Sequence, residues 1–351
     1  MSEDPARAYY RILDAAANRA GEGLRTLEEY ARFGLDDANL TEQLKRLRHG
    51  LTATLAPIAR ERLLNARDTP GDVGTAITLS SERQRESAED VVAAAAARTQ
   101  QSLRCLEEYS KTIDPNIAVQ IEQLRYRSYS LMATLELQQI VHSRRERIGG
   151  ASIYVLIDAG PSVDQLAATV RSLDDAGIDV LQLRDPNIDD RTLYDRACAV
   201  SKLLDHSSTI FIVNDRPDIA AAAEADGVHV GQEEIPVAAA RRIVGGHRLV
   251  GVSTHSISQA RDAVADGADY IGCGPVFPGR TKAFDSYVGP ALLKQVAGEI
   301  DLPAFAIGGI DTSNVAKVAD AGFTRIAVTG AIRDAENPAK VIAQLRTHLE
   351  R

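Results

Sequence analysis

The sequence predicts an α/β protein in two parts, an all-α domain built from a duplicated helix pair and a C-terminal (β/α)8 TIM barrel. Two observations lead to this: a helical motif occurs twice in the first half, and from Ile153 onward short apolar runs alternate with amphipathic ones. At 351 residues the chain exceeds the roughly 250–300 residues at which single cores stop growing. We place the helical domain at 1–145 and the barrel at 151–351, with SRRERIGG (143–150) as the boundary.

The first half contains an internal duplication. The motif LRxLEEY occurs at 24–30 and at 103–109, an offset of 79 residues (103 − 24). In both copies the two leucines, the tyrosine and the following small residue lie at i, i+3, i+6 and i+7, on one face of a helix. A second helical pattern follows each copy, from residue 44 and from residue 121, so the repeated unit is a helix pair and the whole a helical bundle.

The loop ARDTPGDVGT (66–75) separates the two repeats. Its proline and glycines interrupt any helix, and it carries the carboxylates Asp68 and Asp72. Two interpretations stay open for this segment. It is either a linker between the repeats or a loop that holds a metal or a phosphate.

The second half alternates eight strand signals with eight helix signals. Continuous Val/Ile/Leu strands separated by helices are typical of a parallel sheet buried on both faces. Eight such units in about 200 residues fit a closed barrel better than an open, doubly wound sheet. The expected strands are 153–158, 180–184, 210–214, 227–231, 248–253, 269–274, 303–308 and 325–330.

Polar and glycine residues follow these strands, where barrels of this type place their reactive groups. Asp215 and Glu234 are hard oxygen ligands suited to Mg²⁺. Arg184 and Lys282 are cations that can compensate a pyrophosphate. The other candidates offer neutral hydrogen bonds or bare amides for a phosphate: Gln182, Asn214, Ser253, Thr281, Gly309, Thr329 and Gly330.

The histidines give no general base. His229 alternates within its strand, which favours a structural role, whereas His255 is better placed to touch substrate. Without a nucleophile–base pair acyl transfer is disfavoured, and a metal with cations indicates ionisation of a C–O bond.

Bulk properties exclude several partners. The net charge of −9 disfavours nucleic acid and anionic membranes. The three cysteines have no paired spacing, so neither disulfides nor zinc is predicted. The N-terminus lacks an apolar leader and no stretch approaches a membrane span, so we expect a cytoplasmic protein.

The barrel half resembles the thiamine phosphate synthase family through QLRD (182–185), FIVNDRPDIA (211–220), ADGVHVGQEE (225–234), GVSTHS (251–256) and ADYIGCGPVFPGRTK (268–282). The resemblance implies that hydroxymethylpyrimidine diphosphate is joined to a thiazole phosphate, carboxylated or not, with release of pyrophosphate. It implies Mg²⁺ at Asp215 and Glu234, and catalytic roles for Arg184, Ser253 and Lys282. The substrate-binding set that it implies is Gln182, Leu183, Arg184, Asp185, Asn214, Ser253, Thr281, Lys282, Gly309, Thr329 and Gly330.

The sequence departs from the family pattern in three places. Pro186 replaces a lysine that follows the QLR motif, and Glu234 replaces a second aspartate. The loop reads Gly279-Arg280-Thr281-Lys282 where the family often has TxTK, and Arg280 is a candidate to replace the missing cation. Two alternatives stay open: a thiazole tautomerase-like isomerase, which needs neither the metal pair nor the lysine, and an inactive thiamine phosphate-binding sensor.

The helical half resembles the N-terminal domain fused to some of these synthases, through DAAANRAGEGLRTLEEYARF and RDTPGDVGT. The resemblance implies an alternative hydroxymethylpyrimidine phosphate kinase. The sequence has no GxxxxGK[ST] loop, so a kinase here would not be of the P-loop type. The candidate residues are Asn18, Arg19, Arg25, Asp68 and Asp72. The structural alternative is a dimerisation module, and with it a homo-oligomer.

Overall fold

The computed structural model describes residues 5–77, 84–279 and 287–349. Contacts divide the chain into two compact units, Met1–Gln139 and Ile140–Arg351. The boundary expected at 143–150 lies at the end of a long helix whose last residues belong to the second unit. Among the described helices, none is long and apolar enough to cross a membrane.

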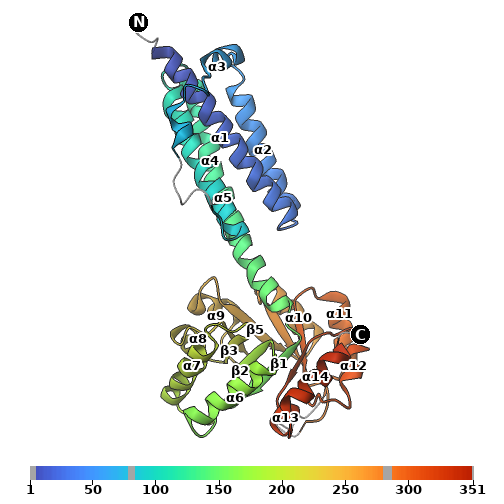
Figure 1. Ribbon diagram of the computed structural model, residues 1–351. Helices are drawn as coiled ribbons and strands as arrows, with labels where there is room; N and C mark the ends of the chain where they lie inside the picture. Colours follow the sequence, from blue (N-terminus) through green and yellow to red (C-terminus); the bar gives the residue numbers. More distant parts are fainter. Residues whose placement is uncertain (1–4, 78–83, 280–286, 350–351) are drawn as a thin grey trace. The chain divides into compact units, whose positions relative to one another are not determined.

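The first unit is all helical, as the sequence predicts (Figure 1). Helices α1 and α4 carry the two copies of the repeated motif and pack against each other, with all four motif leucines buried. Asp37 and Ser87 cap α2 and α4 by accepting backbone N–H groups. The helices are α1 (Pro5–Phe33), α2 (Ala38–Leu55), α3 (Arg60–Ala66), the 3₁₀ helix η1 (Val73–Ala76), α4 (Ala88–Ser110) and α5 (Pro115–Gly149).

The second unit is a closed barrel of parallel strands in the order β1 to β8, which confirms the predicted fold class. Its strands are β1 (Ile153–Ile157), β2 (Val180–Leu183), β3 (Ile210–Asn214), β4 (Gly227–Val230), β5 (Leu249–Thr254), β6 (Tyr270–Cys273), β7 (Ala304–Ile307) and β8 (Ile326–Val328).

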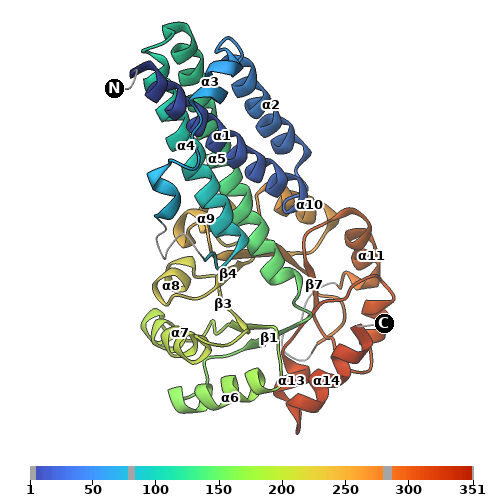
Figure 2. The same ribbon diagram turned by 45° about the horizontal axis from the view of Figure 1, so that its top comes forward.

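Helices follow the strands and surround the barrel (Figure 2). They are α6 (Val163–Asp175), α7 (Asp190–Leu204), α8 (Pro217–Ala222), α9 (Val237–Val244), α10 (Ile257–Ala265), α11 (Gly289–Glu299), α12 (Val315–Ala319), α13 (Gly330–Arg333) and α14 (Pro338–Leu349). The short helix α13, directly after β8, has no counterpart among the predicted elements. The main core lies between strands and helices, and a smaller one fills the barrel interior.

Three aspartates fix the amino end of the barrel. Asp179, Asp226 and Asp269 directly precede β2, β4 and β6, and each accepts a backbone N–H from the preceding strand at 2.7 to 2.8 Å. Each also pairs with an arginine, and the partners of Asp226 and Asp269 include Arg147 and Arg144 from the end of α5. Their lone pairs are therefore used to hold strands and α5 together, which is a stability role.

Candidate active site

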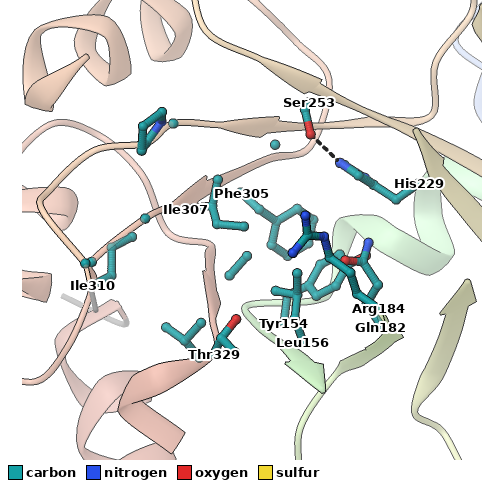
Figure 3. A pocket seen from close by; sticks show the side chains of 18 of the residues that line it. Tyr154, Leu156, Gln182, Arg184, His229, Ser253, Phe305, Ile307, Ile310 and Thr329 are labelled. Carbon is teal, nitrogen blue, oxygen red and sulfur yellow. Dashed lines mark hydrogen bonds between the residues drawn. The ribbon is translucent and has the colours of Figure 1, made fainter. Parts of the chain in front are cut away.

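A cavity of about 870 Å³ opens at the carboxyl ends of the barrel strands (Figure 3). Side chains alternate along a strand, so on β2 and just after it Gln182 and Arg184 point inward while Leu183 packs against the helices. The guanidinium of Arg184 points into the cavity. Tyr154 and Phe305 form part of an apolar wall.

A series of hydrogen bonds between side chains crosses the barrel interior at the bottom of this cavity. Ser253 Oγ lies 3.0 Å from His229 Nε2, and His229 Nδ1 lies 3.2 Å from the hydroxyl of Tyr270. The Tyr270 and Tyr154 hydroxyls are 3.2 Å apart, and Gln182 Nε2 donates to Tyr154 at 2.9 Å. The series therefore connects Gln182 on β2 with Ser253 on β5 and fixes both side chains.

His229 is neutral in this setting. Desolvation in the barrel interior, and secondarily the charge of Arg184, lower the pKa of His229 to about 4. Burial likewise raises the pKa of Tyr154 and of Tyr270, so both phenols stay protonated. With Gln182 donating to Tyr154, each group in turn donates to the next, and His229 Nε2–H donates to Ser253. The hydroxyl hydrogen of Ser253 is then available to a ligand.

Two carboxylates line the same cavity. Asp215 follows β3 with a φ of +61°, its amide donates to the carbonyl of His229 at 2.8 Å, and its carboxylate accepts from Asn214 Nδ2 at 2.5 Å. Aspartate tolerates this left-handed conformation better than most residues. Glu234, in the loop after β4, folds back so that its Oε2 would lie 2.2 Å from a Cβ at Gly231. Both are hard oxygen donors, as Mg²⁺ requires.

The donor set suits a metal that keeps several external ligands. Within residues 5–77, 84–279 and 287–349, no three His, Cys, Asp or Glu side chains gather as a cluster that could hold a metal ion. Mg²⁺ is commonly bound through one or two carboxylates, with water and substrate phosphates completing its octahedron. Asp215 and Glu234 therefore fit such an ion.

Glycines close the opposite side of the cavity. Gly308 and Gly309 follow β7 with φ values of +104° and +61°. A Cβ at Gly309 would lie 2.4 Å from the carbonyl oxygen of Pro278, so no larger residue fits there. Thr329 and Gly330, at the start of α13, complete this side. Backbone amides beside glycines suit a phosphate group.

The structure brings most of the sequence-predicted residues into one cavity. These are Gln182, Arg184, Asn214, Asp215, Glu234, Ser253, Gly309, Thr329 and Gly330. Two predicted substrate-binding residues are not among those that line it. Leu183 packs in the outer core, and Asp185 accepts the amides of Ala159 and Asn187 and so shapes the loop. Arg280, Thr281 and Lys282 lie outside the described residues.

Sequence reasoning gave no site role to His229, Tyr154 or Tyr270, which line the cavity. The alternation within GVHVG does place His229 inward, yet its contact with Ser253 depends on how β4 and β5 pair. His255, the histidine expected nearer substrate, also lines the cavity, with Nδ1 2.5 Å from the carbonyl of Gly274.

The candidates in the helical unit are dispersed. Arg25 pairs with Glu28 and Glu29, and Asn18 contacts Asp14. Asp68 accepts the amide of Gly71, which shapes the loop. Arg19 and Asp72 line a second, smaller cavity within this unit.

Comparisons with known proteins cover both units. The family described as thiamine monophosphate synthase matches residues 153–332, and the ThiD2 family matches residues 11–134. A thiamine-phosphate synthase from Rhodopirellula baltica is 50% identical over 357 residues, covering 100% of this chain and 95% of the relative. One from Nostoc punctiforme is 40% identical over 351 residues, covering 100% and 97%.

Among solved structures, a thiamine phosphate pyrophosphorylase from Pyrococcus furiosus is similar, with a TM-score of 0.51 and 31% sequence identity. The match covers 59% of this chain and 97% of that one.

Proposed function

The chain belongs to the thiamine-phosphate synthase family, and from that premise we propose how its barrel cavity forms thiamine phosphate. The substrates are 4-amino-2-methyl-5-hydroxymethylpyrimidine diphosphate and a thiazole phosphate, and pyrophosphate is released. The observation that carries the proposal is that one cavity joins two carboxylates, an inward arginine and a fixed Gln182–Ser253 pair. An isomerase without pyrophosphate chemistry would not need the pair of carboxylates.

We assign the aminopyrimidine to the floor of the cavity. Gln182 and Ser253 are held by the hydrogen-bond chain, so they offer fixed polar groups to the ring nitrogens and the amino group. Asn214, at the end of β3, adds a further amide beside them. The neutral ring of His229 keeps Ser253 a donor toward the ligand.

The diphosphate lies toward Asp215, Glu234 and Arg184 in this proposal. Mg²⁺ held by the two carboxylates would neutralise diphosphate charge and favour its departure. Arg184 offers a planar fork of donors to the phosphate oxygens. The C–O bond breaks with its electron pair going to pyrophosphate, and the thiazole nitrogen then forms the C–N bond to the pyrimidinylmethyl carbon.

The thiazole phosphate lies against the glycine side. Gly309 and Gly330 leave their amides accessible, and the Thr329 hydroxyl lies beside them. The roles of Thr281 and Lys282 rest on the family resemblance, as does the substitution of Arg280 for the cation missing at Pro186. A cytoplasmic location and a homo-oligomer stay predictions from the sequence.

We propose further that residues 140–351 are sufficient for this reaction. The unit holds its own core, and it includes Arg144, Arg147 and Ile148 at the end of α5. A chain that begins at residue 151 lacks these contacts, so we expect it to melt at a lower temperature than one that begins at Ile140. An inactive but folded 140–351 fragment would show that the helical unit completes the site.

The test is turnover by the purified full chain. Both substrates are supplied with and without Mg²⁺, and the product is detected after conversion to fluorescent thiochrome. We expect product and pyrophosphate in equal amounts, and only with the metal. Failure of the metal-supplied chain to form any product would reject the proposal.

A further inference from the structure

We infer that three side chains of the barrel interior force Gln182 and Ser253 into opposite hydrogen-bonding roles toward a ligand. The three are Tyr154, Tyr270 and His229, which lie between Gln182 and Ser253 in the series of hydrogen bonds. The cavity therefore selects a ligand that presents one donor and one acceptor. This inference rests on the function proposed for the barrel, because it names the feature of the pyrimidine that the site requires.

Each interior group has one hydrogen to donate along the series. A phenol donates one hydrogen and accepts at its oxygen, and a neutral imidazole has an N–H on one nitrogen and a lone pair on the other. His229 is neutral because it is buried. Its two ring nitrogens contact Ser253 on one side and Tyr270 on the other, and Figure 3 shows the first of these contacts. When one ring nitrogen accepts, the other must donate.

The series consequently has only two directions. In the direction described above, Gln182 Nε2 donates to Tyr154, and each group donates to the next as far as Ser253. In the described part of the chain Gln182 Oε1 has no donor, so it accepts from a ligand while Ser253 donates to one.

Rotation of the Gln182 amide by half a turn gives the second direction. The rotation exchanges the nitrogen and the oxygen of the amide, two arrangements that have nearly the same shape. Every bond in the series then reverses, so Gln182 donates to the ligand and Ser253 accepts from it. In both directions one end of the series donates to the ligand and the other accepts.

Packing fixes the two tyrosines that transmit this constraint. Tyr270 is fully buried, and Gly251 on β5 leaves room for its ring, since a Cβ there would lie 2.1 Å from Tyr270 Cζ. Phe305 meets the rings of Tyr154 and Tyr270 edge-on, with centroid distances of 5.2 and 5.8 Å. Within the described residues, the two hydroxyls have no hydrogen-bond partners outside the series.

An aminopyrimidine satisfies both ends of the series. Its amino group donates to Gln182 Oε1, and a ring nitrogen accepts from Ser253. A ligand with acceptors at both places leaves either Gln182 Oε1 or Ser253 Oγ facing a lone pair, whichever direction the series takes. One buried hydrogen bond left unmade weakens binding by about tenfold or more.

The first experiment determines the tautomer of His229 in the full chain without substrate. Gln182→Glu, studied at about pH 9, places a carboxylate at one end of the series, and a carboxylate only accepts. Tyr154 must then donate toward position 182, every bond reverses, and the hydrogen of His229 moves from Nε2 to Nδ1. Nitrogen-15 NMR of the histidine-labelled chain distinguishes the two tautomers, and the loss of signals in His229→Asn assigns them.

Two further variants control this experiment. Gln259→Glu makes the same change of amide to carboxylate in the same cavity, where Oε1 of Gln259 accepts the amide of His255 outside the series. This control should leave the hydrogen of His229 on Nε2. Tyr270→Phe interrupts the series, so adding Gln182→Glu to it should no longer change the tautomer. An unchanged tautomer in Gln182→Glu, or the same change with Tyr270→Phe present, would overturn the inference.

A second experiment measures selection directly and does not depend on the folding of Gln182→Glu. Calorimetry without thiazole phosphate compares the aminopyrimidine diphosphate with its 4-methoxy analogue, which has acceptors at both places. We expect the wild type to bind the analogue at least tenfold more weakly, and Tyr270→Phe to lose about tenfold of this discrimination because its two ends orient independently. The bulk of the methoxy group affects both proteins alike and cancels in the ratio. Equal discrimination by both proteins would overturn the inference.

The two proposals fail in different ways. The tautomer of His229 is measured without substrate, so an unchanged tautomer contradicts only the coupling of Gln182 with Ser253. Absence of thiamine phosphate in the turnover assay would reject the proposed function and would leave the tautomer result standing.

Discussion

The two ends of the barrel use carboxylates for opposite purposes. At the amino end, Asp269 is 1% exposed and its oxygens accept from a strand amide and from two arginines. At the carboxyl end, Asp215 and Glu234 line a cavity large enough for substrates. Both ends use carboxylates, so the surroundings determine the role of each one. A carboxylate enclosed by backbone amides and arginines stabilises the fold, whereas a carboxylate that lines the cavity is positioned for a ligand.

The largest expected effect concerns the cavity end. Asp215→Ala removes a proposed metal ligand, and such stabilisation is worth several kcal/mol, so we expect turnover to fall about 10³-fold. The side chain is not part of either core, and alanine tolerates the φ of +61° less well than aspartate, so the melting temperature should fall by only a few degrees. Thiochrome detection of product measures the first effect and calorimetry the second. A variant that melts much earlier would place Asp215 with the structural carboxylates.

The next effect concerns the amino end. Asp269→Ala leaves Arg144 and Arg241 without their shared partner in a largely buried setting, so unfolding should become easier by about 3–5 kcal/mol. Turnover per folded molecule should stay unchanged. Glu299→Ala, which breaks an exposed pair with Arg261, is the control and should cost less than about 1 kcal/mol. A similar loss of unfolding free energy in Asp269→Ala and Glu299→Ala would argue against a stabilising role for the buried pairs of Asp269 with Arg144 and Arg241.

His229 predicts a pH effect on stability. Its pKa is about 4 in the folded chain against about 6.5 unfolded, so below pH 6.5 the unfolded chain takes up the proton first. The contribution of neutral His229 is thus full above pH 6.5 and is lost as the pH falls toward 4, by up to about 3 kcal/mol. Denaturant titrations of wild type and His229→Asn should diverge over this window. Parallel curves would contradict a desolvated, neutral ring.

The smallest effect separates charge from geometry at the cavity. Arg184→Lys keeps the positive charge and loses the planar fork, so we expect turnover to fall about tenfold, equivalent to one charge-assisted hydrogen bond. Steady-state kinetics with the pyrimidine diphosphate varied measures the change. A loss as large as that of Asp215→Ala would mean that bidentate contact matters as much as the metal.

Much of this arrangement could be predicted from the sequence. The spacing of apolar residues predicts the closed barrel and the helical repeats. The positions of Gln182, Arg184 and Asp215 at the ends of strands predict that these residues line one cavity. Leu183 and Asp185, which the family resemblance adds to the substrate-binding set, do not line the cavity. Leu183 alternates outward on β2, and Asp185 accepts the amide of Asn187 in the loop after it.

The remainder depends on contacts that a linear pattern does not contain. The hydrogen bonds from Gln182 to Ser253 pass through Tyr154, Tyr270 and His229. Tyr270 on β6 meets Tyr154 on β1 and His229 on β4 only across the interior of the closed barrel, because neither of those strands pairs with β6. The second, smaller cavity of the helical unit, which Arg19 and Asp72 line, likewise depends on the packing of α1 against α4.

The central claim is that carboxylates at the cavity end hold the metal while those at the amino end hold the fold. Titration of Mn²⁺ into the full chain with pyrophosphate present, followed by electron paramagnetic resonance, tests it most directly. We predict a site on the wild-type chain that is lost in Asp215→Ala and in Glu234→Ala and retained in Asp269→Asn. Equal Mn²⁺ binding by the wild type and both cavity variants would contradict the account.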